Sequence, residues 1–225
     1  MRIILIVWMI IVLSSCQSTS NTRDIVGKKI GVDYKLYESL SLCHSHLGFT
    51  VFQNTKEIYD IETDINELVT AGYMKGIKQA NNLPIEVDSG IRWSNFLSYS
   101  SWDSSATLNN SGLEKLDNVS KKYDLDYLLI ARDYEVFFKG EACNGAWFNT
   151  QNGSVRSFVP IYVALIFDAK SGEYVGTTFI TNDNHKSAYD AVQDVSKLNE
   201  AEVRMLTDYS RDAATMAITS FFEVK

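Results

Sequence analysis

The chain of 225 residues is 45% hydrophobic and 22% charged, which suits one domain with a sizeable core. Its formal net charge is −7, and it contains no run of basic residues. An acidic chain of this kind has no electrostatic footprint for nucleic acid, and its charge does not draw it to an anionic membrane surface. We therefore expect no nucleic-acid partner.

The first sixteen residues have the layout of an export signal. Arg2 precedes an unbroken apolar run from Ile3 to Leu13, and a Leu-Ser-Ser-Cys sequence then ends at Cys16. As a helix, this run covers only about 17 Å, which is short of the roughly 30 Å hydrocarbon core of a bilayer. An uncleaved transmembrane helix is therefore the weaker alternative.

This arrangement resembles the signal of bacterial lipoproteins, in which the cysteine is acylated and the preceding peptide is removed. The resemblance implies a lipid on Cys16, with acyl chains such as palmitate that together anchor the protein stably. Residue 17 is Gln, and in well-studied Gram-negative lipoproteins an Asp at this place retains the protein at the inner membrane. The resemblance therefore implies attachment to the periplasmic face of the outer membrane.

We expect three parts in the chain. Residues 1–16 are the signal peptide with the lipid cysteine, residues 17–24 are a short polar tether, and residues 25–225 form a single α+β domain. Eight extended residues reach at most about 26 Å. The tether therefore keeps the domain close to its membrane.

Two further cysteines, Cys43 and Cys143, remain if Cys16 carries the lipid. In an oxidising compartment two thiols are most simply explained as one disulfide. This disulfide would close a loop of about a hundred residues, which in the chain-entropy model raises the free energy of unfolding by roughly 4 kcal/mol. The alternative is two separately buried thiols.

Hydrophobic periodicity and capping residues predict three helices. The first has Asp64 as N-cap and the third begins with Asn199 and Glu202, whereas Ser111 and Glu114 form a capping box for the second. The predicted ranges are Asp64–Ala80, Ser111–Tyr123 and Asn199–Phe222.

Runs of alternating or continuous apolar residues predict the strands. These are Ile30–Leu36, Phe49–Gln53, Pro84–Val87, Asp126–Phe138, Ser157–Phe167 and Glu173–Ile180, with a turn at Asp168–Gly172. Both faces of Ser157–Phe167 are apolar, so it should be central, although Pro160 needs a bulge or an unpaired position. We expect an α+β fold, with a mixed, mostly antiparallel sheet and three helices packed on it.

This order of elements resembles the domain shared by the TolB N-terminal region, the curli secretion lipoprotein CsgG and the penicillin-binding-protein activator LpoB. The residues that carry the resemblance are Tyr123–Ala131, a helix end followed by a strand, and Ile166–Val175, which reads "IFDAKSGEYV". The likeness covers most of Lys29–Val224, but the Pro-Phe pair usual in the first strand is missing. It implies a fold, and only indirectly a function.

We find no short catalytic motif, and we predict no catalytic residue, cofactor or metal site. His44 and His46 share a face of an extended strand and could form half of a zinc site with a distant ligand such as His185. Solvated loop histidines are the commoner explanation. Four acids flank the Asp126–Phe138 strand and are most simply solvated strand-end charges: Asp124, Asp126, Asp133 and Glu135.

Aromatic residues recur at every third position in the serine-rich segment Ser89–Asn110. Exposed Trp and Tyr anchor interfaces, so the segment is a candidate partner-binding loop. The alternative is a connection whose aromatic side chains fold back on the core. Gly140–Gly153, predicted to be a mobile hairpin loop, raises the same question. The candidate partner-binding residues are Trp93, Phe96, Tyr99, Trp102 and Trp147.

These features favour a lipid-anchored periplasmic accessory or adaptor protein of an envelope assembly, without enzymatic activity. Its expected partners are the membrane, through the lipid on Cys16, and an envelope protein. The alternative is a lipid-anchored enzyme that acts on cell-wall or carbohydrate material. A cleft lined by Trp93, Trp102 or Trp147 beside two acids would favour the enzyme, and a flat aromatic patch would favour the adaptor.

Overall fold

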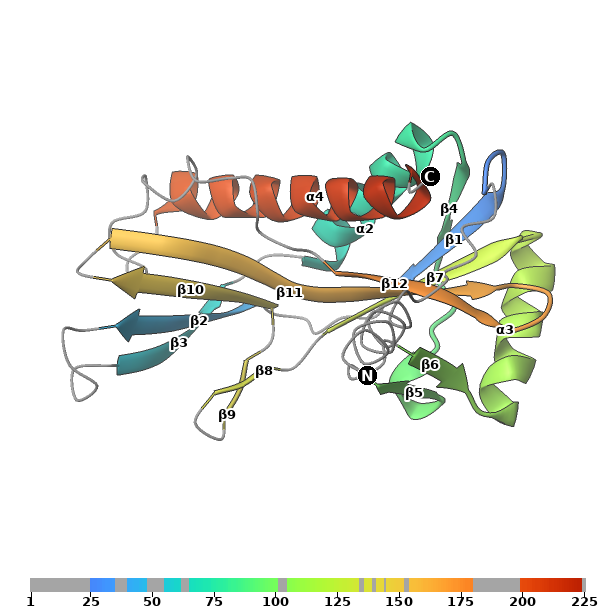
Figure 1. Ribbon diagram of the computed structural model, residues 1–225, viewed down its shortest axis with the longest axis horizontal. Coiled ribbons are helices and arrows are strands. Elements are labelled where there is room, and N and C mark those ends of the chain that lie inside the picture. Colours follow the sequence, from blue (N-terminus) through green and yellow to red (C-terminus); the bar gives the residue numbers. More distant parts are fainter. Residues whose placement is uncertain are drawn as a thin grey trace, which may run out of the picture.

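The structure is a computed structural model that describes residues 25–34, 40–47, 55–61, 65–100, 105–133, 136–138, 141–143, 145–151, 154–179 and 199–223. These residues form an α+β fold, in which a mixed and mostly antiparallel sheet carries three helices (Figure 1). The expected fold class is thus confirmed. In this part of the chain, no helix combines the length and the apolar character needed to cross a bilayer.

Eight strands form the main sheet. Seven follow one another in the order β3 (Thr55–Ile61), β2 (Leu40–Leu47), β10 (Gly145–Gln151), β11 (Ser154–Asp168), β7 (Tyr127–Asp133), β1 (Lys29–Tyr34) and β4 (Leu83–Val87), and β12 (Tyr174–Phe179) also pairs with β11. β1 runs parallel to β4 and β7, and β2 runs parallel to β10. The other pairs are antiparallel.

β11 joins the two halves of this sheet. Its fifteen residues span about 50 Å at the usual rise of a strand. Its second half pairs with β7 and β12, and Tyr162 lies opposite Asp133 at the end of β7. Its first half pairs with β10, which begins one register position further on, where Gly145 lies opposite Ile161. Pairing with β11 therefore ends at Asp133, the last residue of β7, and resumes at Gly145, the first residue of β10.

Shorter elements and the helices complete the fold. The helices are α2 (Ile65–Gln79), α3 (Asn110–Tyr123) and α4 (Glu200–Glu223), with a 3₁₀ turn η2 (Trp93–Asn95). Two small antiparallel hairpins are formed by β5 (Leu97–Ser100) with β6 (Ser105–Leu108) and by β8 (Val136–Phe138) with β9 (Glu141–Cys143).

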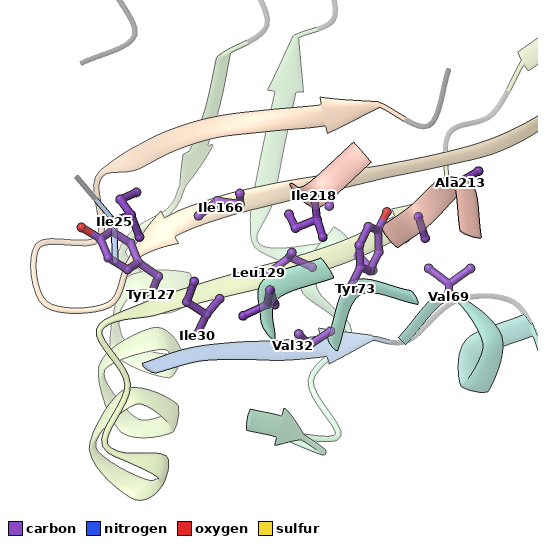
Figure 2. Packing of buried hydrophobic residues seen from close by; sticks show 14 of the residues in the cluster. Ile25, Ile30, Val32, Val69, Tyr73, Tyr127, Leu129, Ile166, Ala213 and Ile218 are labelled. Atoms are coloured by element: carbon purple, nitrogen blue, oxygen red, sulfur yellow. The ribbon is translucent and has the colours of Figure 1, made fainter. Parts of the chain in front are cut away.

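The second half of β11 contributes to two hydrophobic clusters because its side chains alternate between the faces of the sheet. Ala164 and Ile166 are buried against α2 and α4 in the cluster that Figure 2 shows. Val163, Leu165 and Phe167 are buried on the other face, against α3 and η2. The prediction of a central strand with two apolar faces is confirmed for this half.

Of the three predicted helix starts, one agrees with the structure, one is corrected, and Asp64 lies outside the described residues. Helix α4 begins at the predicted Asn199 and Glu202, which form a capping box. The Asn199 side chain accepts a hydrogen bond from the Glu202 amide at 3.0 Å, and the Glu202 carboxylate accepts one from the Asn199 amide at 2.8 Å. For α3 the cap is Asn109 instead of Ser111, because the Asn109 side chain accepts from the Gly112 amide at 2.9 Å.

The strand predictions differ from the structure in four places. The hairpin of β5 and β6 lies within Ser89–Asn110, where no strand was predicted. The Asp126–Phe138 run is divided into β7 and β8, and the latter pairs only with β9. The expected loop at Gly140–Gly153 is wrong, because β10 lies within it and pairs with both β11 and β2. Strands β2 and β3 were not predicted, and Phe49–Gln53 lies outside the described residues.

Helices α2 and α4 pack closely because α2 has glycine where they touch. The Thr215 hydroxyl of α4 donates to the Gly72 carbonyl of α2 at 3.0 Å. A Cβ atom on Gly76 would lie 2.5 Å from the Thr215 carbonyl oxygen and closer still to the Ile218 side chain. Backbone meets backbone here, and no larger residue fits.

Gly76→Ala is therefore expected to destabilise the fold by about 2 kcal/mol, a typical cost of overpacking. Helix propensity alone predicts the opposite sign, a gain of about 1 kcal/mol. Urea unfolding measures the difference, and Ala71→Gly, at an exposed position of α2, calibrates the propensity of this helix. A Gly76→Ala protein as stable as wild type would contradict the close packing of α2 and α4.

Candidate functional site

The carboxyl ends of β4, β1 and β7 lie at one edge of the main sheet because these three strands are parallel. In open sheets with parallel strands, this edge is where ligands usually bind. Asp33, near the end of β1, lies opposite Val87 of β4 and Ile130 of β7. It is thus a charged residue placed between two apolar strands.

Asp33 is the centre of a hydrogen-bonded group, which we call the Asp33 clamp and which consists of Asp33, Ser89 and Trp93. Asp33 is only 2% exposed. The indole N–H of Trp93 donates to its Oδ2 at 2.7 Å, and the Ser89 hydroxyl donates to the same oxygen. The Ser89 hydroxyl oxygen also accepts from the Ile91 amide at 3.0 Å. The clamp therefore fixes the connection from β4 to η2.

The surroundings of Asp33 act on its pKa in opposite directions. Burial raises the pKa of Asp33 above its ordinary value, and the negative charge of Asp88 adds to this effect. The hydrogen bonds from Ser89 and Trp93 lower it in part. The net result is a raised pKa, because removal of a carboxylate from water disfavours its charged form.

A buried acid with a raised pKa is a general candidate for a functional group. In the clamp, however, Oδ2 of Asp33 is used to hold a connecting segment. Within the ranges that the structure describes, no three His, Cys, Asp or Glu residues come together as possible metal ligands. What the clamp can do is position η2 and the hairpin of β5 and β6 that follows it.

The structure corrects the prediction for Trp93. This residue is 4% exposed and belongs to the cluster on the α3 face of the sheet, so it does not offer its side chain to a partner. The reason is the acceptor that Asp33 provides, since a buried indole N–H needs a hydrogen-bond partner. Of the two alternatives for the segment, folding back on the core holds for this residue.

The other four aromatic candidates have different outcomes. Tyr99 of β5 is partly buried against the same cluster as Trp93, and Phe96 is half-buried with the Lys115 ammonium 5.0 Å from its ring centroid. Trp102 lies outside the described residues, as does the side chain of Trp147 in β10. Partner binding by these four residues stays a prediction.

Sequence reasoning missed Asp33 and Ser89 as partners of Trp93. The available signal was the charge in the otherwise apolar run Ile30–Tyr34. A carboxylate in such a strand must be buried and must find donors, since an unpaired buried charge is very costly. The sequence does not tell which donors these are.

The predicted disulfide is not tested by the described side chains. The strand register places Cys43 opposite Trp147 and Cys143 opposite Val136, so neither cysteine is the direct strand partner of the other. His44 and His46 lie on β2, where their strand partners are Glu57 and Phe148 for His44, and Thr55 and Thr150 for His46. The lipidation site Cys16 lies outside the described residues.

Two of the four acids near β7 have structural partners. Asp124 forms an ion pair with Lys29, which lowers the pKa of Asp124 through the hydrogen bond and the lysine charge. The carboxylate of Asp126 accepts a hydrogen bond from the Lys29 amide at 3.0 Å. Through these contacts, the segment that connects α3 to β7 is held against the start of β1. The Asp133 side chain and Glu135 lie outside the described residues.

Comparison of the chain with family models, with curated proteins and with solved structures gives no match. The resemblance to the TolB N-terminal region, CsgG and LpoB therefore stays a hypothesis.

Trp93→Ala is expected to destabilise the protein by about 3–5 kcal/mol, because it removes a buried aromatic side chain. It also leaves Asp33 without one of its donors. Urea unfolding measures the loss. Phe96→Ala, from the same segment but half-buried, is the matched control and should cost much less. Equal losses for the two variants would show that Trp93 is not the anchor of this segment.

Asp33→Asn tests the raised pKa. Because the folded-state pKa of Asp33 lies above its unfolded value, its contribution to stability is complete below about pH 4 and is lost as the pH rises through the folded-state pKa. Asn accepts the same hydrogen bonds without a charge. The melting temperature of wild type minus that of the variant should therefore fall with rising pH. A difference that is constant or that rises between pH 3.5 and 7 would contradict this assignment.

Proposed function

We propose that the protein is a lipid-anchored periplasmic accessory or adaptor protein of an envelope assembly, held at the outer membrane, and that it is not an enzyme. Two features of the sequence support the address. The Leu-Ser-Ser-Cys sequence ending at Cys16 resembles a lipoprotein signal, and residues 17–24 are a short polar tether. The location of the protein does not say what it does. Its activity must come from the folded domain.

The observation that carries the adaptor proposal is the commitment of Asp33 to the clamp. The acid with the raised pKa at the ligand-binding edge of the parallel strands holds a loop in place. The loop leads into η2 and the hairpin of β5 and β6, and the Asn109 amide donates to the Phe96 carbonyl at 3.0 Å at the open end of this hairpin. Because Asn109 is also the N-cap of α3, the hairpin is joined directly to that helix. A surface fixed in this way loses little conformational freedom on binding, which favours recognition.

We name this candidate surface the hairpin surface and define it by Phe96, Leu97–Ser100 and Ser105–Leu108. Phe96 and Ser98 give it an aromatic and a polar contact group, and Ser98 is exposed. Aromatic residues with adjacent small polar ones are typical of protein-binding surfaces. The partner class that fits is another protein of the cell envelope.

The alternative function, an enzyme acting on cell-wall or carbohydrate material, requires a cleft lined by tryptophans beside a pair of acids. Trp93 was one of three candidates for that lining, and its burial in the core removes it. Asp124 and Asp126, the acids of the candidate pair that the structure describes in full, interact with Lys29. These contacts favour the adaptor over the enzyme.

The test is capture of partners by cross-linking in intact cells. A Phe96→Ala, Ser98→Arg double variant is expected to lose the cross-linked envelope partner with only a small loss of thermal stability, because Phe96 is half-buried and Ser98 is exposed. A Met216→Ala, Ser220→Arg variant changes exposed positions of α4 and is the matched control. The proposal fails if both variants capture the same partner as wild type. Release of soluble cell-wall fragments by the purified protein would favour the enzyme instead.

A further inference from the structure

The polypeptide enters the domain along a fixed path beside β4. The Gly27 amide donates to the Asn81 carbonyl at 2.9 Å, and the Leu83 amide donates to the Lys28 carbonyl at 2.8 Å. We call this contact, formed by residues 25–28 and 80–83, the entry junction. It holds the first described residues against the start of an edge strand of the main sheet.

A buried amide side chain locks the entry junction. Asn82 is 3% exposed, and its Nδ2 donates to the Ile25 carbonyl at 2.8 Å while its Oδ1 accepts from the Lys28 amide at 3.0 Å. The Ile25 side chain is buried in the core cluster beside Tyr127 (Figure 2). The orientation of the neighbouring residues is therefore fixed by the fold.

The entry junction turns two apolar side chains outward. Val26 and Leu83 are 60% and 55% exposed, more than any other large hydrophobic residue in the described part of the chain. They belong to neighbouring segments, since the Leu83 amide bonds to the carbonyl two residues after Val26. A single exposed leucine needs no explanation, but two exposed hydrophobic side chains on one rigid junction are a candidate contact surface.

Two lysines accompany this apolar pair. Lys28 lies between Val26 and the start of β1, and Lys78 stands in the last turn of α2, where its carbonyl accepts from the Asn81 amide at 3.1 Å. Within the described residues neither ammonium group has an ion-pair partner. Of the acids at this end of the sheet, Asp124 pairs with Lys29 and Asp126 with Lys170. Asp168 accepts hydrogen bonds from the Lys170 and Ser171 amides, and Glu173 lies exposed in the turn before β12.

The chain that precedes the entry junction limits what can lie opposite it. Eight residues, 17–24, separate Cys16 from Ile25, and the nine extended Cα-to-Cα steps between these two residues reach at most about 30 Å. The entry junction is thus the described surface closest along the chain to the proposed lipid. A bilayer has the matching chemistry, because its headgroup region accepts apolar side chains and its phosphates accept lysines.

We propose that the entry junction is the face by which the domain rests on the phospholipid bilayer. Val26 and Leu83 enter the headgroup region, and Lys28 and Lys78 contact phosphate groups. This proposal rests on the proposed lipid attachment at Cys16. Burial of the exposed parts of two such side chains strengthens attachment only roughly 10- to 100-fold. The contact therefore acts together with the lipid, whose short tether keeps its local concentration high.

The test uses the full lipidated protein in vesicles of phosphatidylethanolamine and phosphatidylglycerol. The lysines are labelled with a water-soluble amine-reactive reagent, and mass spectrometry measures the labelling rates of Lys28 and Lys78. Each rate is divided by the labelling rate of Lys115 on α3. In a Val26→Ser, Leu83→Ser variant these relative rates should rise at least threefold. A Leu113→Ser, Met216→Ser variant, which changes the two other exposed hydrophobic residues, should react like wild type. Melting temperatures establish that the variants are folded.

The outcomes separate the docking contact from the anchor. The docking contact is overturned, and the anchor stays intact, if the vesicle-bound protein carries a fatty-acid label but its lysines do not respond. In that case Lys28 and Lys78 react equally in wild type and in the Val26→Ser, Leu83→Ser variant. Loss of the threefold effect at low protein density in the vesicles shows that a second copy covers the junction, which also overturns it. If the protein takes up no labelled fatty acid at Cys16, both the lipid anchor and the docking contact are overturned.

Discussion

The fold depends above all on the burial of both faces of β11. Four of its large apolar residues, Val163, Leu165, Ile166 and Phe167, are fully buried, and they alternate between the α3 face and the α2–α4 face. At about 1.5–3 kcal/mol for each, they contribute roughly 6–12 kcal/mol, which is comparable to the whole stability of a typical domain. Each helix layer packs on residues of this one strand. On the α2–α4 face, the two helices also approach each other closely, and the Thr215 hydroxyl donates to the Gly72 carbonyl.

The features that depend on neighbouring residues could be predicted from the sequence. The α4 capping box is made by Asn199 and Glu202, three residues apart, and the apolar period of α2 lies within a single helix. β2 and β10 each have a hairpin partner close in sequence, β3 and β11, but they also pair with each other across about a hundred residues. This long-range pairing could not be predicted from the local pattern. The same applies to the candidate site. The spacing of the aromatic residues does not tell which of them are buried. The burial of Trp93 depends on its hydrogen bond to Asp33, which lies sixty residues earlier in the chain.

The Asp33 clamp shows how a costly group can be useful to a fold. A buried carboxylate lowers stability unless donors compensate it, and here the indole of Trp93 and the hydroxyl of Ser89 do so in part. In return, the connection after β4 has one conformation instead of many, and the hairpin of β5 and β6 begins at a defined place. Specificity of conformation is a recognised use of buried polar groups. This makes the raised pKa of Asp33 compatible with a structural role and does not by itself require catalysis.

The two proposals are related through β1. Lys29, at the start of this strand, adjoins the entry junction, and Asp33, near its end, holds the connection that leads to the hairpin surface. If the entry junction rests on the bilayer, the parallel strands β1, β4 and β7 begin at the membrane and their carboxyl ends point away from it. Figure 1 shows that β10, β2 and β3 extend the sheet further in the same general direction. In that arrangement the short tether keeps the start of β1 near the lipid, and the hairpin surface lies beside α3, on the other face of the sheet from α2 and α4 (Figure 1).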